Sequence, residues 1–190
     1  MIRQLAEQGF AIVDEVLPHN QLQALQQSAL RSLATYAKLA GTGRGQDHAV
    51  NADIRQDRIV WLDAADAASA TFLAHMEQVR MQLNQQLFLG LFSYECHYAC
   101  YEPGAFYRKH LDAFKGGRNR RLSTVFYLNS DWLPDAGGEL LIFRNDGETV
   151  AATVSPLANR LVLFLSEEFP HEVLSATRQR LSIAGWFRGA

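Results

Sequence analysis

The sequence has little cysteine, no excess of positive charge and no long apolar run. Its 18 Lys and Arg residues are outnumbered by 20 Asp and Glu residues, giving a net charge of -2. Proteins that bind the nucleic-acid backbone usually carry a basic surplus. No stretch approaches the roughly 18 apolar residues that span a bilayer, and Arg3, Glu7, Asp14 and Glu15 interrupt any secretory signal at the start of the chain. We therefore expect no nucleic-acid partner, no membrane segment and a cytoplasmic location.

The two cysteines, Cys96 and Cys100, lie in an aromatic-rich stretch over 94–101 that is typical of a β-strand. Residues four apart in a strand are separated by about 13 Å, whereas a disulfide needs Cα atoms within about 7 Å. We therefore expect two reduced thiols, as in a reducing compartment. A zinc site would need more Cys or His residues at short spacing, and only His97 is nearby.

The composition is that of one packed globular domain spanning 1–190. Hydrophobic residues make up 48% of the chain, charged residues 20% and aromatic residues 11%, which excludes a disordered tail or a fibre. The first part, 1–91, mixes strand and helix patterns that would support the rest. Short apolar runs predict strands, and apolar residues at helical spacing predict helices. The predicted strands are 10–13 and 58–62, and the predicted helices cover the apolar positions of 22–33 and 72–87.

The second part, 92–189, predicts short strands separated by turns. The turns carry Pro and Gly, as in Glu102-Pro103-Gly104 and Asn145-Asp146-Gly147. Regularly spaced strands of this kind favour a barrel or jelly roll, here mainly β with helices packed on one sheet. The predicted strands are 92–101, 106–112, 122–129, 139–143, 149–154, 160–165, 171–174 and 180–187.

The first motif whose residue types could bind a metal or take part in catalysis is His110-Leu111-Asp112, inside one of the predicted strands. Residues i and i+2 of a strand face the same side, so the imidazole and the carboxylate could converge. Such a pair also arises by chance, and the alternative is a surface ion pair on an exposed strand.

Two later residues favour a metal centre. His171 opens a later predicted strand, and Arg180 opens the last one. Two His and one carboxylate leave three positions of an octahedron free, which suits a non-haem Fe(II) that also binds a cosubstrate and dioxygen. A buried Arg suits a dicarboxylate, because its planar guanidinium pairs bidentately with a carboxylate. Taken singly, His171 is more often a structural His and Arg180 an ion-pair partner.

Segments along most of the chain also carry a family resemblance. They are 100–104, 107–112, 126–129, 137–140, 170–173 and 180–186, together with 53–61 and, more faintly, 9–14. On these motifs the sequence resembles the 2-oxoglutarate- and Fe(II)-dependent dioxygenases, specifically the prolyl 4-hydroxylase branch and the bacterial relatives of the hypoxia-inducible-factor prolyl hydroxylases. The family fold is a double-stranded β-helix (jelly roll), in agreement with the predicted strands.

The resemblance implies an iron held by His110, Asp112 and His171. It implies that Arg180 and the Tyr127 hydroxyl bind the distal carboxylate of 2-oxoglutarate, and that Tyr101 lines the same pocket; for Tyr127 the alternative is core packing. O2 is then the oxidant, succinate and CO2 are released, and ascorbate is the reductant for the iron. The implied reaction hydroxylates a prolyl residue of a protein, with elongation factor Tu as the substrate that the resemblance suggests.

The resemblance also implies residues near the substrate. Asp57 and Trp61 match residues at the entrance, and Tyr107 and Trp186 match aromatics that pack on the target proline. A glycine-spaced loop within 41–57 would fold over the site, or would be a plain surface loop.

A basic cluster, 117–121, lies between two predicted strands. It is either a solvated turn or a contact to the substrate or to Asp57, made by Arg120 or by Arg121. Glu102 lies between Tyr101 and Pro103, where the animal enzymes have no residue. The resemblance therefore does not fix the shape of the pocket at this point.

Two other readings remain. The chain could hydroxylate a free amino acid or another small molecule by the same chemistry. It could instead be a non-catalytic jelly-roll binding module or a cupin-like zinc protein, which would have no reason to carry Arg180 and Tyr127. We expect the protein to be a monomer.

Overall fold

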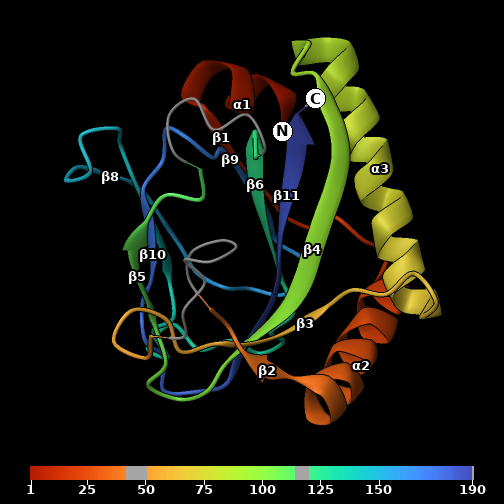
Figure 1. The fold of residues 1–190 in the computed structure, drawn as a ribbon, viewed down its shortest axis with the longest axis vertical. Helices are drawn as coiled ribbons and strands as arrows, with labels where there is room; N and C mark the ends of the chain where they lie inside the picture. The colour runs from red at the N-terminus through yellow and green to blue at the C-terminus, as the bar shows by residue number, and fades with distance from the viewer. Residues whose placement is uncertain (42–50, 114–119, 190) are drawn as a thin grey trace.

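A computed structural model describes residues 1–41, 51–113 and 120–189, and within them the strands form two sheets (Figure 1). The larger sheet has the order β1 (Phe10–Val13), β9 (Leu161–Leu165), β6 (Leu122–Tyr127), β11 (Arg180–Gly189), β4 (Leu91–Tyr101), β3 (Arg58–Trp61) and β2 (Lys38–Leu39). The smaller sheet has the order β5 (Tyr107–His110), β10 (His171–Val173), β7 (Leu140–Phe143) and β8 (Val150–Val154).

From β4 onward successive strands alternate between the two sheets, except that β7 and β8 follow each other in the smaller one. β4, β6, β9 and β11 lie side by side in the larger sheet, and β5, β7, β8 and β10 form the smaller one. The neighbouring strands of each sheet are antiparallel. This arrangement is a double-stranded β-helix, so the predicted jelly roll is confirmed.

The period of two along β4 separates two hydrophobic cores. Cys96, Tyr98 and Cys100 belong to the core that includes the buried faces of the helices. Ala99 and Tyr101 belong to the second core, with residues of the smaller sheet. Alternate residues of the larger sheet therefore face either the helices or the space between the sheets. Both cysteines are buried free thiols, as expected.

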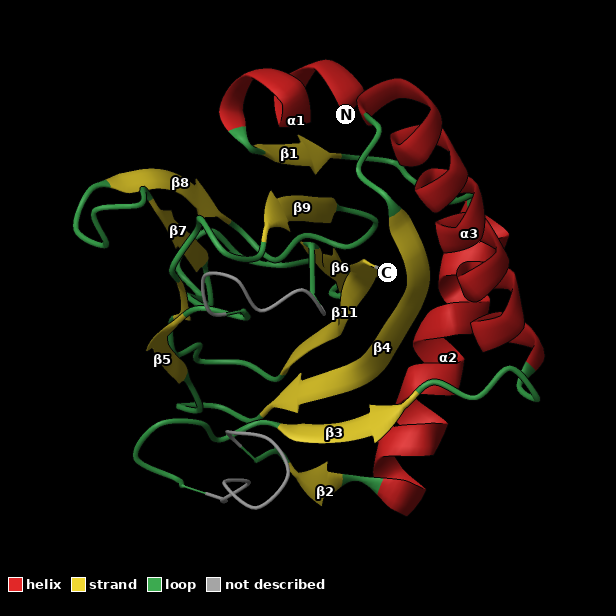
Figure 2. Cartoon of the chain, turned by 45° about the horizontal axis from the view of Figure 1, so that its top comes forward, coloured by secondary structure: helices red, strands yellow, loops and turns green. Residues whose placement is uncertain are grey.

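Helices cover one face of the larger sheet, opposite the smaller sheet (Figure 2). They are α1 (Ile2–Gln8), α2 (His19–Tyr36) and α3 (Ala67–Leu87). α2 and α3 extend beyond the apolar positions that predicted them, and α1 and the two-residue β2 were not predicted. The N-cap of α3 is Asp66, whose carboxylate accepts a hydrogen bond from the backbone N–H of Ser69.

The strand that carries His110 is shorter than predicted. β5 ends at His110, so Leu111 and Asp112 lie beyond it. The expectation that His110 and Asp112 share a strand face through its period of two is therefore wrong. The chain bends after His110 instead, and the convergence of the two side chains comes from this bend.

Gly185 of β11 is held by close packing. A Cβ atom there would lie 2.7 Å from the Cβ of Cys96 and would also meet the Tyr94 ring. We expect Gly185→Ala to lower the free energy of unfolding by about 1–3 kcal/mol, as overpacking does, and Gly185→Val to lower it further. Urea unfolding of the three proteins measures this, and an alanine variant as stable as the parent would contradict it.

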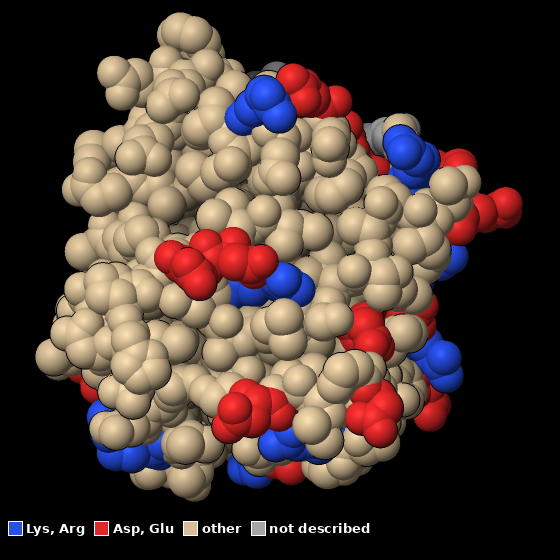
Figure 3. Space-filling view, turned by 180° about the vertical axis from the view of Figure 1, so that it is seen from behind, with Lys and Arg blue, Asp and Glu red and all other residues tan. Residues whose placement is uncertain are grey.

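The surface gives no sign of a basic patch on the face shown in Figure 3, where basic side chains lie beside acidic ones. Across the described ranges, no helix is both long enough and apolar enough to cross a membrane.

Candidate metal centre

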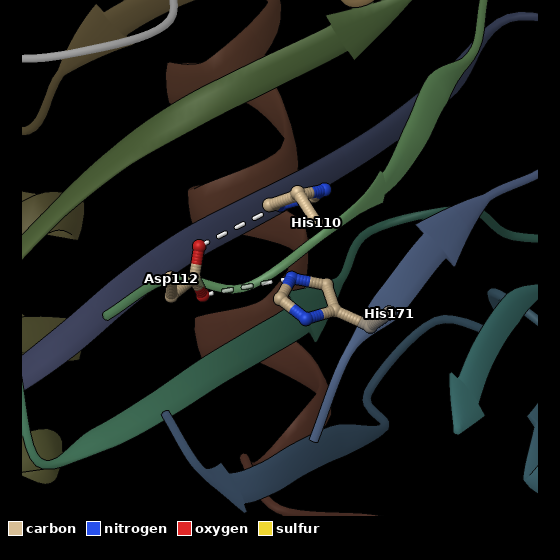
Figure 4. A group of neighbouring side chains, drawn as sticks. All are labelled: His110, Asp112 and His171. Carbon is tan, nitrogen blue, oxygen red and sulfur yellow. Dashed lines mark ion pairs between the residues drawn. The ribbon is translucent and has the colours of Figure 1, made fainter. Parts of the chain in front are cut away.

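Three metal-ligating side chains converge between the sheets. His110 ends β5, His171 begins β10, and these two residues are paired in the register of the smaller sheet. Asp112 follows two residues after His110, and the three side chains point toward one another (Figure 4). One ligand atom from each lies within 4.8 Å of the other two. The sequence prediction that His171 joins the His110 and Asp112 pair is therefore matched by the geometry.

The two imidazoles are oriented alike. The Nδ1 atom of His110 lies 2.7 Å from the carbonyl oxygen of Arg108, and that of His171 lies 3.1 Å from the carbonyl oxygen of Phe169. Donation from each Nδ1–H leaves the lone pair on Nε2. Each Nε2 lies 3.6 Å from a carboxylate oxygen of Asp112. Both imidazoles therefore present an acceptor nitrogen to the same point as the carboxylate.

The charge states also suit metal binding. Burial lowers the pKa of His171 to about 4, and the neighbouring His110 lowers it as well. Burial alone would raise the pKa of Asp112, but the two imidazoles and the hydroxyl of Ser123 hold it well below its usual value. A neutral imidazole and an ionised carboxylate are the forms that ligate a metal.

Ser123, on β6, holds the carboxylate from the larger sheet. Its Oγ donates to Asp112 Oδ2 at 2.7 Å and lies 2.8 Å from the Oγ of Ser166. Asp112 is thus tied to the opposite sheet although it follows the end of β5. The sequence carried no signal for this contact, because nothing distinguishes Ser123 from the other two serines in the predicted strands.

Arg180 lies at the start of β11 with only 1% of its surface exposed. Its Nε donates to the carbonyl oxygen of Gly138 at 2.8 Å, while its terminal nitrogens lie 3.5 Å from the hydroxyls of Ser182 and Tyr127. Within the described part of the chain, no carboxylate lies within 4.0 Å of its guanidinium nitrogens. A buried charge normally requires a partner, so this guanidinium is suited to an anionic ligand.

Two phenols flank that guanidinium. The Arg180 Cζ atom lies 5.0 Å from the ring centroid of Tyr101 and 5.1 Å from that of Tyr127. Burial raises the pKa of both phenols, so both hydroxyls stay protonated. The structure therefore brings together the three residues that the resemblance assigned to the cosubstrate.

The aromatic residues expected near the substrate lie in two places. Tyr107 stacks on His110, with ring centroids 3.6 Å apart. Trp186 lies beneath the guanidinium of Arg120, whose Cζ is 3.4 Å from the ring centroid. Arg120 also binds Glu95 at 3.2 Å, whereas Arg121 is exposed. Arg120, rather than Arg121, is thus next to an expected substrate residue.

The ring of His97 lies between those of Trp61 and Trp186, and the three rings form one aromatic wall. Its ring lies 5.6 Å from that of Trp186 and 5.3 Å from that of Trp61, which is 53% exposed. Burial, together with the nearby charge of Arg55, lowers the pKa of His97 to about 4, so this wall carries a neutral imidazole. From the sequence, His97 was considered only as an insufficient donor for a zinc site.

Asp57 is fully buried and its carboxylate is held by Arg55, a partner that sequence reasoning missed. The signal was present, because opposite charges two residues apart beside a predicted strand can share one face. The expected loop 41–57 is described only at 41 and from 51 onward, and most of its glycine-spaced part lies outside the described residues. The same holds for residues 117–119 of the basic cluster.

The donor set and the buried guanidinium together fit one class of protein. Two His and one carboxylate suit non-haem Fe(II) with open positions, and a buried Arg without a carboxylate partner among the described residues suits a dicarboxylate. Fold and site thus define a non-haem iron oxygenase with a dicarboxylate cosubstrate.

Comparison with known proteins gives the family. Residues 96–188 match the model of the 2OG-Fe(II) oxygenase superfamily. The structure of a prolyl-4-hydroxylase from Pseudomonas putida superposes with a TM-score of 0.89 and 43% identity, covering 100% of this chain and 97% of that one. The chain belongs to the 2OG-Fe(II) oxygenase superfamily, as a member of the prolyl hydroxylase type.

More distant relatives agree. A prolyl hydroxylase from Trichoplax adhaerens, in complex with a peptide of the oxygen degradation domain of hypoxia inducible factor, superposes with a TM-score of 0.85 and 27% identity, covering 98% of this chain and 86% of that one. The hypoxia-inducible factor prolyl hydroxylase of Caenorhabditis elegans is 31% identical over 98% of this chain. Egl nine homolog 1 of Homo sapiens is 29% identical over 71% of it. The chain spans only 27% and 33% of the lengths of these two curated relatives.

Proposed function

We propose that this protein is an Fe(II)- and 2-oxoglutarate-dependent dioxygenase that hydroxylates a prolyl residue in a protein, releasing succinate and CO2. The observation that carries the proposal is the buried guanidinium of Arg180, which has no carboxylate partner among the described residues, in the same jelly roll as the convergent His110, Asp112 and His171. A metal-binding module without a cosubstrate has no need for such a charge.

In this proposal His110 and His171 hold the iron through Nε2 and Asp112 holds it through a carboxylate oxygen. The iron, when bound, supplies the redox chemistry that couples oxidative decarboxylation of 2-oxoglutarate to insertion of one oxygen atom of O2 into a C–H bond. The protein orients the ligands. The carbonyl oxygens of Arg108 and Phe169 fix the imidazole rings, and Ser123 fixes the carboxylate.

Arg180 binds the distal carboxylate of 2-oxoglutarate as a bidentate, charge-assisted pair. The Tyr127 hydroxyl, 3.5 Å from the guanidinium, adds a donor to the same carboxylate, and the Tyr101 ring flanks the guanidinium at 5.0 Å. The second hydrophobic core surrounds this group and keeps water from the buried charges.

A protein substrate is favoured over a free amino acid by the exposed ring of Trp61, which packs on the buried rings of His97 and Trp186. Trp186 is paired in register with Ser123, the residue that holds Asp112, and an exposed aromatic ring suits contact with a peptide segment around a pyrrolidine ring. The Trichoplax relative was solved with a peptide. We propose elongation factor Tu as the first substrate to test, ascorbate as the reductant that maintains the iron, and a monomer acting in the cytoplasm.

The test is incubation of the protein with Fe(II), 2-oxoglutarate, ascorbate and purified elongation factor Tu, beside a reaction with free L-proline. We expect a gain of one oxygen atom on a proline of the protein, located by tandem mass spectrometry, with a matching amount of succinate. Neither product should form with His110→Ala. Hydroxylation of free proline alone would favour the small-molecule alternative, and a protein that binds neither Fe(II) nor 2-oxoglutarate would favour the binding module.

A further inference from the structure

A buried ion pair outside the donor set, formed by Arg55 and Asp57, lies beside the metal centre. Arg55 donates from Nε to Asp57 Oδ1 at 2.6 Å and from a terminal nitrogen to Oδ2 at 2.8 Å. The side chain of Asp57 is fully buried and that of Arg55 is 12% exposed. This bidentate geometry fixes the plane of the guanidinium. The Asp57 and Arg55 side chains are not part of the donor set, so their role is not explained by metal ligation.

The guanidinium of this pair lies over Tyr107. The Arg55 Cζ atom is 4.7 Å from the ring centroid of Tyr107, within the range of a cation–π contact. Tyr107 in turn stacks on His110, with 3.6 Å between ring centroids and 15° between ring planes. A continuous series of contacts thus runs from Asp57 through Arg55 and Tyr107 to the imidazole of His110.

The backbone makes the same connection. Arg55 forms an antiparallel bridge with Tyr107, and the N–H of Arg108 donates to the carbonyl oxygen of Ile54 at 2.9 Å. Residues 54–56 therefore lie along the free edge of β5. The chain then enters β3 of the larger sheet at Arg58. This segment joins the two sheets at the strand that ends in His110.

We propose that the Asp57–Arg55 pair is a positioning device that holds the imidazole of His110 in its metal-binding orientation through the ring of Tyr107. The inference rests on the proposed function in one respect, namely that His110 is an iron ligand. Asp57, Arg55 and Tyr107 are positioning residues, because they act through His110 and do not touch the metal. β5 contributes only four residues, and His110 is the last of them, so contacts from outside the strand add to the hydrogen bond with the Arg108 carbonyl oxygen in fixing its ring.

The test removes the charges without leaving one of them buried and unpaired. The double variant Arg55→Met/Asp57→Leu replaces the pair by apolar side chains, a change that proteins often tolerate. Binding of Co(II) is titrated in the absence of 2-oxoglutarate and substrate, and the ligand-field absorption spectrum is recorded. We expect Co(II) affinity about 10-fold or more weaker than in the parent, as when a support of a metal ligand is lost, together with an altered spectrum.

Arg160→Met/Asp14→Leu is the control. It replaces another bidentate Arg–carboxylate pair, with distances of 2.6 and 3.0 Å, by the same apolar side chains; this pair is more exposed than the Asp57–Arg55 pair and is not in contact with the donor set. Co(II) affinity and spectrum should equal those of the parent. A folded double variant that also equals the parent in both would overturn the proposal. A parent that does not bind Co(II) would overturn the proposed function, and this inference with it.

If the double variant does not fold, two variants of Tyr107 test the same proposal. Tyr107→Phe keeps the ring that contacts His110 and Arg55, whereas Tyr107→Leu removes it. We expect Tyr107→Phe to retain the parental Co(II) spectrum and Tyr107→Leu to lose it. Parental spectra from both variants would overturn the role assigned to the ring.

Discussion

His171→Ala is expected to bind Fe(II) more than about 100-fold more weakly than the parent and to form no product above background. Loss of a hydrogen-bond partner of a metal ligand costs about 10–100-fold in metal affinity, and loss of the ligand itself costs more. His171 is also the ligand that the smaller sheet contributes from β10, opposite His110. Without it one imidazole and one carboxylate remain, and the three-ligand set that fits Fe(II) is lost. Calorimetric titration under anaerobic conditions measures the affinity.

A change of fold must be separated from loss of the ligand. His171 is 5% exposed and lies 4.7 Å from Phe164 between ring centroids, so alanine leaves a cavity. His97→Ala is the matched control, because His97 is equally buried and its pKa is also lowered to about 4 by burial, yet it is outside the donor set. We expect His97→Ala to keep parental Fe(II) affinity. Parental affinity in His171→Ala would refute the assigned ligand set.

Much of this fold follows from the sequence because each strand shows its own pattern. Alternating residues along β4 divide between two cores, so both the strand and its two buried faces were predictable. The long helices were predictable from their apolar spacing. Short elements were not: α1 has a single buried residue, Leu5, and β2 has two exposed residues, so neither carries a periodic signal.

The site was predictable in its residue types and less so in its geometry. His110, Asp112 and His171 converge on one point, and Arg180 is buried. The strand period that we used to place Asp112 does not apply, because β5 ends at His110. A bend after His110 and a hydrogen bond from Ser123 place the Asp112 carboxylate instead. The contact with Ser123 depends on how the two sheets face each other, which the sequence pattern does not show. The Arg55 contact to Tyr107 is of the same kind, since 52 positions separate the residues.

Arg180→Met is expected to weaken 2-oxoglutarate binding strongly while leaving Fe(II) binding intact. Removing one partner of a buried, hydrogen-bonded charge pair costs about 2–5 kcal/mol, which corresponds to roughly 30-fold to several thousand-fold weaker binding. The metal ligands lie on other elements and should be unaffected. Isothermal titration with 2-oxoglutarate, in the presence of Mn(II) as a redox-silent metal, measures the change. Arg180→Lys keeps the charge but not the planar fork, so an intermediate affinity is expected.

Thermal unfolding tests the same role from the folded state. In the parent without cosubstrate, the Arg180 guanidinium is buried without a carboxylate among the described residues, so replacing it by Met removes a costly charge as well as the hydrogen bond to Gly138. We therefore expect the unliganded variant to be about as stable as the parent. A ligand at about 100 times its Kd adds about 2.7 kcal/mol of stability. That gain should appear in the parent on addition of Mn(II) and 2-oxoglutarate and be limited to the contribution of Mn(II) in Arg180→Met. An equal gain from 2-oxoglutarate in both proteins would show that the cosubstrate binds elsewhere.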